Sequence, residues 1–204
     1  PRPVTQQFEG GCHRFTLTPD HSKALKQLSR AHNATLFTTL MSAFQVLLHR
    51  YCGATDLVVG TPESNRPEAS LEGVLGMFVN TLALRGDFSK EISFSDYLQQ
   101  MQAIALEAYA NQNVPFEQVI DTLNIPRNWS HSPLFQVLFV WQAAKVNAIT
   151  PIENTTWRPI PLESNTTKVD LTLSMTEEGA HLSGKFEYRK DLFHPGTVAA
   201  MADA

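Results

Sequence analysis

The 204-residue sequence lacks features that mark several large classes of protein. Its two cysteines, Cys12 and Cys52, are too few for a disulfide scaffold or a zinc site, so we expect reduced thiols in a cytoplasmic protein. No apolar run approaches the roughly 18 residues that cross a bilayer, and the first residues do not resemble a signal peptide. The net charge of −4 offers no basic field for nucleic acid. These absences argue against secreted, membrane-bound and nucleic-acid-binding proteins.

Motifs of common active sites are missing as well. The chain has no G-x-S-x-G nucleophile elbow, no G-x-G-x-x-G fingerprint and no glycine-rich phosphate loop. Its seven histidines show no spacing that places two metal ligands on one face. His131 lies in a loop with Trp129 and Pro133, where packing is a better explanation than catalysis. The residues alone therefore indicate a lobe with no bound metal and no complete active site.

What the sequence does contain is enough apolar material for one core, with 43% hydrophobic and 18% charged residues. Thr18-Pro19-Asp20 is typical of a helix start, and Gly53 of a helix end. Apolar residues at helical spacing predict further helices after Asn33, from Phe94 and from Val114. We also expect one helical turn within 72–77 and a last helix from Pro195.

Strand patterns alternate with these helices. Short β-rich runs predict strands at 15–17, 56–61 and 79–84. The almost wholly apolar run 136–142 suits an interior strand covered on both faces. Clean alternation on either side of a TEEG turn predicts a β-hairpin over 169–188. Together these elements predict a layered α/β fold with a mixed sheet flanked by helices.

One amide, Asn80, interrupts the apolar run LGMFVNTLALR at 75–85. A buried amide without hydrogen-bond partners costs a few kcal/mol, so either the fold or a ligand must satisfy it. In the first interpretation, Asn80 caps or bridges backbone groups between two elements. In the second, its amide faces a substrate channel and binds an amide or thioester ligand. The sequence leaves both open.

Other prominent residues favour structural roles. We expect Arg85 to form a surface ion pair and Arg66 to hold its own loop through carboxylates or carbonyls. Glu117 stands at a helix start, where a negative charge interacts favourably with the helix dipole. The aromatic residues expected in the core are Trp129, Phe135 and Trp141.

Five segments, in order, resemble motifs of the condensation domains of nonribosomal peptide synthetases. The segments LGMFVNTLALR, NQNVPFE (111–117) and RNWSHSPLF (127–135) resemble the family patterns IGxFVNTxxxR, HQDxPFE and RDxSRxPLF. The segments DLVVGTPESNRPE and KVDLTLSM resemble DxVVGTPxxGR and KFDLTL. There are two departures: His131 in place of an Arg loses a permanent charge, and Asn113 in place of an Asp cannot ionise. The family's HHxxxDG motif, whose second His is catalytic, is absent from this chain.

The resemblance implies that residues 15–204 form the C-terminal subdomain of such a domain, one chloramphenicol-acetyltransferase-like lobe. Residues 1–14 would be the linker from the N-terminal lobe. A tunnel between the lobes would have Asn80 and Thr81 near its wall. The loop on its floor would contain Pro62, Ser64 and Arg66. Motif residues with implied structural roles are Gly76, Phe78, Arg85, Pro115, Phe116, Glu117, Arg127 and Pro133.

The family forms a peptide bond between acyl or aminoacyl groups, so phosphopantetheine arms of carrier proteins would be substrates and no cofactor would be bound. Implied partners are the N-terminal condensation subdomain, donor and acceptor carrier proteins, and an adjacent adenylation domain. Both ends of the sequence suggest a longer gene product, and we expect this chain to be inactive alone. An alternative is a catalytically silent module that recruits a tailoring enzyme or docks carriers. Epimerisation and heterocyclisation fit the FVNT segment less well.

Overall fold

The computed structural model describes residues 2–66, 68–126, 128–142 and 165–204. In these residues, six strands form one sheet, accompanied by five α-helices and one short 3₁₀ helix. The strands are β1 (Gly10–Thr16), β2 (Asp56–Glu63), β3 (Asn80–Asp87), β4 (Val137–Gln142), β5 (Leu171–Glu178) and β6 (His181–Arg189). The helices are α1 (Pro19–Ala31), α2 (Leu36–Cys52), the 3₁₀ helix η1 (Ala69–Leu71), α3 (Phe94–Ala110), α4 (Phe116–Thr122) and α5 (Pro195–Asp203).

The sheet is mixed, as predicted, with the strand order β1-β6-β5-β4-β2-β3. Strand β4 runs parallel to both of its neighbours, β2 and β5. The other neighbouring strands are antiparallel, and β5 and β6 form the predicted hairpin. Its turn contains Gly179 at a φ of +61°, a conformation that favours glycine. This order brings the first strand of the chain against the last.

Helix ends follow local capping signals, of which Thr18 and Gly53 were predicted. The side chains of Thr18, Thr35 and Ser93 each accept a hydrogen bond from a backbone N–H in the first turn of α1, α2 and α3. Helix α2 ends at Gly53, which has a left-handed φ of +68°. These local signals explain why the helix boundaries were readable from the sequence.

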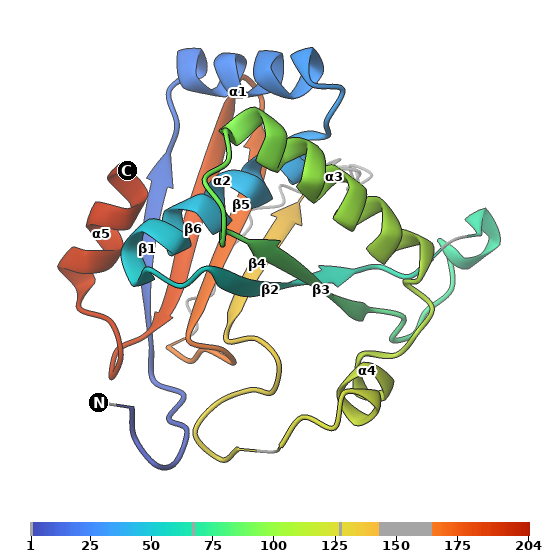
Figure 1. Cartoon of the computed structure of the whole chain (residues 1–204), viewed down its shortest axis with the longest axis vertical. Helices are drawn as coiled ribbons and strands as arrows, with labels where there is room; N and C mark the ends of the chain where they lie inside the picture. Colours follow the sequence, from blue (N-terminus) through green and yellow to red (C-terminus); the bar gives the residue numbers. More distant parts are fainter. Residues whose placement is uncertain (1, 67, 127, 143–164) are drawn as a thin grey trace, which may run out of the picture.

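The core lies between the sheet and the helices. Helices α2 and α3 cross one face of the sheet, and α5 lies beside β1 (Figure 1). Buried side chains alternate along β5 and β6, so one face of this hairpin is apolar and the other carries hydroxyl and charged groups. Helix α4 stands apart from the other helices, near β3 (Figure 1). The completely buried apolar core residues include Met41, Val59, Leu98, Met101, Phe139, Leu182 and Val198.

The structure corrects two predicted boundaries. The first strand begins at Gly10, so residues 10–14, expected in a linker, belong to the sheet. They do so because β1 pairs with β6, with Gly10 opposite Arg189, a long-range contact that no local pattern announces. The helical turn expected within 72–77 occurs earlier, as η1.

Two predictions of burial were also wrong. Strand β4 is interior to the sheet, as predicted, but of its residues only Phe139 is fully buried, so complete cover of both faces is not found in the part of the chain that the structure describes. Trp129, expected in the core, is 88% exposed. By contrast, Phe135 is buried and Trp141 packs against the core, as predicted. An aromatic residue in a loop has no periodic pattern to fix its direction, which explains the error at Trp129.

Candidate functional site

Asn80, the first residue of β3, bridges this strand to the start of α4. Its Nδ2 donates hydrogen bonds to the carbonyl oxygens of Gln112 and Val114, each at 2.7 Å. Its Oδ1 accepts a hydrogen bond from the backbone N–H of Phe116 at 3.2 Å. That N–H belongs to the first turn of α4, where no intrahelical acceptor exists. One side chain therefore satisfies three backbone groups of the segment that leads into α4.

This geometry favours the first of the two interpretations of Asn80. A primary amide has two N–H donors and one carbonyl acceptor with two lone pairs. Both donors of Asn80 are engaged, and only one lone pair of Oδ1 remains. An amide that donates to a substrate would first have to release a backbone carbonyl. Asn80 thus bridges elements, and it has no free donor for a ligand.

Aromatic packing also holds this helix. The Phe116 and Phe135 rings lie 5.2 Å apart between centroids. Phe135 in turn covers Gly60 of β2, where a Cβ atom would lie 2.4 Å from the ring. Only glycine permits so close an approach. Gly60, Asn80, Phe116 and Phe135, which we call the motif junction, connect four of the five segments that resemble family motifs.

Arg66 stabilises the connection between β2 and β3 through contacts within it. The guanidinium lies 4.3 Å from the centroid of the Phe78 ring, a cation–π geometry, and donates a hydrogen bond to the carbonyl of Leu71. The predicted loop-holding role of Arg66 is therefore confirmed. Gly76 lies beside the same ring, since a Cβ there would come within 3.1 Å of Phe78.

The remaining predicted floor residues lie at the end of β2. Pro62 is a strand residue opposite Thr81, so β2 extends further than expected. Ser64 follows the strand and its hydroxyl donates to the Glu63 carboxylate at 3.0 Å. The structure thus brings Pro62 and Thr81 together at one end of the β2–β3 pair.

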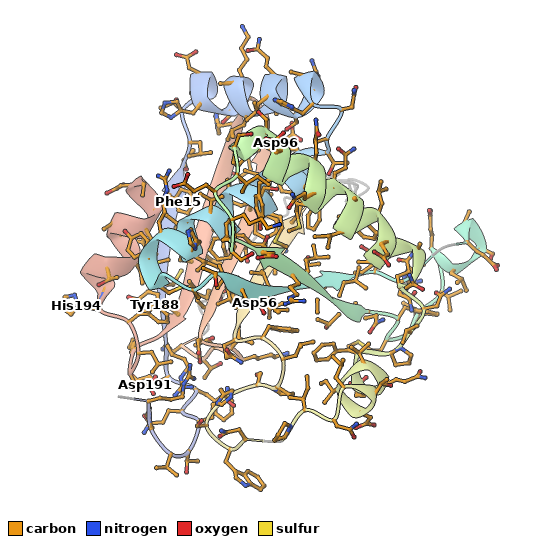
Figure 2. The ribbon with its side chains drawn as sticks, viewed as in Figure 1. Phe15, Asp56, Asp96, Tyr188, Asp191 and His194 are labelled. Carbon is orange, nitrogen blue, oxygen red and sulfur yellow. The ribbon has the colours of Figure 1, made fainter. Side chains whose placement is uncertain are left out.

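Arg85 forms the predicted surface ion pair. Its Nε and Nη2 donate to the two carboxylate oxygens of Asp56 at 2.8 and 2.9 Å. These hydrogen bonds lower the pKa of Asp56 below its ordinary value. Figure 2 shows Asp56 at the start of β2, and both side chains are largely exposed. Because solvent screens exposed pairs, this contact contributes little to stability.

Three other motif residues stand in the expected places, and one lies outside the described residues. Glu117 occupies the first turn of α4, and Pro115 is the residue that precedes the helix. Pro133 precedes Phe135, whose backbone N–H donates to the Pro133 carbonyl at 2.8 Å. Nothing is described for Arg127.

A buried ionic cluster, which the sequence did not reveal, ties the chain ends to the RNWSHSPLF loop. Arg189, at the end of β6, has no exposed surface and donates through Nη1 to Asp170 at 3.3 Å. Its Nε and Nη2 donate to Asp191 at 3.0 and 2.5 Å, which lowers the pKa of that carboxyl. Arg2 forms a second, bidentate pair with Asp170, and this contact raises the pKa of Arg2. We call these four residues the ionic cluster; Asp191 is labelled in Figure 2.

The ionic cluster also reaches the loop. The carbonyl of Ser130 accepts hydrogen bonds from Arg189 at 3.3 Å and from Arg2 at 3.5 Å. Arg2 lies 168 residues before Asp170, and the pairing of β5 with β6 brings Asp170 and Arg189 together. The one sequence signal for the ionic cluster was Arg189, a charged residue at the end of a strand. Removing one partner of a buried pair leaves an uncompensated charge, so the cluster is a strong constraint on this region.

The described residues contain no metal-binding group of three or more His, Cys, Asp and Glu side chains. His131 packs in its loop, with Nδ1 at 2.8 Å from the Ser130 hydroxyl, as expected. Among the described residues, no helix is both long and apolar enough to cross a membrane.

Comparison with known proteins identifies similar sequences and folds. A family model described as the condensation domain matches residues 1–204. One of the linear gramicidin synthase proteins of Brevibacillus parabrevis is 44% identical over 204 residues, which are 99% of this chain and 3% of that protein. The crystal structure of holo-AB3403, a four-domain nonribosomal peptide synthetase bound to AMP and glycine, is 28% identical with a TM-score of 0.89. That match covers 98% of this chain and 16% of the synthetase chain.

A second solved structure has a similar shape. The X-domain from teicoplanin biosynthesis is 26% identical with a TM-score of 0.87, and the match covers 100% of this chain and 47% of that one. The chain therefore spans only a small part of the synthases that it matches, and about half of this shorter relative.

Proposed function

Because this chain belongs to the condensation-domain family, we propose that it is the C-terminal lobe of a domain that forms peptide bonds. In this proposal the lobe begins with β1 at Gly10, and the residues before it lead from an N-terminal lobe. The substrates are acyl and aminoacyl groups held as thioesters on the phosphopantetheine arms of donor and acceptor carrier proteins. The acceptor amine attacks the donor thioester carbonyl, the carbonyl carbon becomes an amide, and the donor thiol leaves.

The observation that carries the proposal is a loop whose large apolar side chains are exposed. Between η1 and β3, the side chains of Leu75 and Met77 are 99% and 88% exposed. Neighbouring exposed apolar side chains of this size are typical of a surface that meets a partner. Next to these residues, Arg66 packs on Phe78 and holds the end of the loop. A second lobe that covers Leu75 and Met77 accounts for the surface.

The proposal divides the chemistry between the two lobes. The other lobe supplies the catalytic His of HHxxxDG, a motif that this sequence does not contain. This lobe supplies wall and floor through Thr81, Pro62, Ser64 and the loop that Arg66 holds. Asn80 contributes by fixing α4, since its amide donors are already engaged.

The proposed setting is a cytoplasmic multidomain synthetase. The relatives that contain similar sequence are many times longer than this chain, which supports further domains in the same polypeptide. An adenylation domain that loads the acceptor carrier is the proposed neighbour.

The test uses the lobe together with the upstream half of its own domain. The two halves are produced as separate polypeptides, mixed, and supplied with aminoacyl-loaded donor and acceptor carriers. We expect the halves to associate and to form a dipeptidyl carrier, detectable by mass spectrometry. Leu75→Asp should weaken association by about tenfold or more, whereas Leu106→Asp, at an exposed site on α3, should not. Association that is unaffected by Leu75→Asp contradicts the proposal.

A second candidate is the silent docking module. Its support is the similarity to the X-domain from teicoplanin biosynthesis, which is almost as close in shape as the synthetase. The sequence of the upstream half separates the two candidates. An intact HHxxxDG favours peptide-bond formation, and a degenerate one favours docking of a tailoring enzyme.

A further inference from the structure

Trp129 projects into solvent from a loop that is otherwise well anchored. Its side chain is 88% exposed. A tryptophan carries roughly 150–250 Å² of surface that gains free energy on burial, and this one gains almost none. Tryptophan is also among the residues that most often dominate the binding energy of protein interfaces. An exposed tryptophan therefore calls for an explanation.

The backbone on both sides of the indole is fixed. The carbonyl of Trp129 accepts a hydrogen bond from the backbone N–H of Gln6 at 2.9 Å. The backbone N–H of Ser130 donates to Asn128 Oδ1 at 2.8 Å, and the Ser130 carbonyl accepts from Arg189 of the ionic cluster. The loop is thus held from the N-terminal segment, from within and from β6. A binding group held in this way loses little conformational entropy when it binds.

The indole forms one wall of a pocket shared with α4. This pocket, which we call the Trp129 pocket, has a volume of about 360 Å³ and is lined by Glu117, Ile120, Asp121, Asn128, Trp129 and Pro133. Ile120 and Pro133 supply apolar surface next to the indole. The pocket thus offers apolar and acidic groups side by side.

The two carboxylates of the pocket have no ion-pair partner among the residues that the structure describes. Glu117 and Asp121 are four residues apart on α4, a spacing at which like charges repel along a helix. A cation bound in the pocket would relieve this repulsion and would also be attracted to the face of the indole.

We propose that the Trp129 pocket is a docking site for an arginine side chain of a partner protein, flanked there by an apolar residue. A guanidinium is planar, stacks on an aromatic ring and donates in a fork that matches carboxylate oxygens. It would lie on Trp129 and donate to Glu117 and Asp121, while the flanking apolar side chain packs on Ile120 and Pro133. The same carboxylates repel phosphate, so lipid headgroups and nucleic acid are poor occupants. The inference does not depend on whether the domain is catalytic.

The test is a peptide titration of the isotopically labelled chain followed by NMR. The probe is acetyl-Leu-Arg-Leu-amide, and the matched probe is acetyl-Leu-Gln-Leu-amide, which lacks the charge. The reporter is the indole Nε1–H of Trp129, identified by its loss in Trp129→Ala. We expect a saturable shift with a dissociation constant on the order of 1 mM for the arginine peptide. The glutamine peptide should bind about fivefold more weakly or worse.

Matched variants separate docking from nonspecific attraction. The double variant Glu117→Gln/Asp121→Asn keeps the indole, so its reporter remains, and it should lose about fivefold in affinity and most of the salt dependence. Leu106→Ala, at an exposed apolar site on α3, should bind normally. Three results overturn the proposal. These are no saturable shift at Trp129, equal binding of both peptides, or unchanged affinity in the folded double variant.

Discussion

Replacing Asn80 with alanine tests whether this amide holds α4. The substitution deletes three hydrogen bonds, two to carbonyl oxygens before the helix and one from the N–H of Phe116. A typical intramolecular hydrogen bond contributes about 0.5–1.5 kcal/mol net. The site is half-exposed, so water replaces part of what is lost. We therefore expect unfolding free energy to fall by about 2 kcal/mol, equivalent to a melting temperature roughly 4–8 °C lower.

The assay combines urea unfolding with hydrogen exchange at the amide of Phe116. In Asn80→Ala, the unfolding midpoint should fall and the Phe116 amide should exchange faster. Asn80→Asp keeps an acceptor for this amide but loses both donors and places negative charge against two carbonyl oxygens. It should therefore lose at least as much stability while Phe116 stays protected. Asn113→Ala, at an exposed neighbour without a side-chain hydrogen bond to a described residue, is the matched control. Wild-type midpoints and exchange rates in both Asn80 variants would refute the bridging role.

Three further predictions concern the motif junction, the ionic cluster and the Arg85–Asp56 ion pair. Gly60→Ala forces a methyl group against the Phe135 ring and should cost about 1–3 kcal/mol in urea unfolding; an unchanged midpoint would show that the ring has room to move. Because Arg189 lowers the pKa of Asp191 in the folded state, the contribution of Asp191 is present above the ordinary aspartate pKa of about 4 and is lost as pH falls through the lowered value. In Asp191→Asn, the melting temperature should therefore fall less at acidic pH than in the wild type. The same fall in both proteins would contradict this role of Asp191. Arg85→Gln should leave the melting temperature within error of wild type at moderate salt, since its partner is exposed, and a large drop would mean that solvent screening was overestimated.

The elements with strong local signals were predictable from the sequence. Thr18 and Gly53 marked helix ends, and the alternation in β5 and β6 predicted the hairpin. The ordered motifs indicated a condensation-type lobe with a mixed sheet flanked by helices, and this fold is confirmed. These signals are local in the chain or are carried by short segments, so they can be read without knowing the tertiary fold.

Features created by long-range contacts were not predictable. The early start of β1 depends on β6, and the ionic cluster joins Arg2 to Asp170 and Arg189 across almost the whole sequence. For Asn80, the sequence posed the question of what satisfies the amide, but only the structure could show that backbone groups before α4 do so. The direction of the Trp129 side chain likewise depends on the long-range hydrogen bonds that anchor its loop.

The most direct measurement of the central claim is turnover by this chain alone. The purified 204-residue chain is given aminoacyl-loaded donor and acceptor carriers, and dipeptidyl carrier is sought by mass spectrometry. A parallel reaction contains the upstream half of the domain with its HHxxxDG motif. The account predicts product only in the parallel reaction, and none there when the second His is replaced by Ala. Product from the chain alone would contradict it.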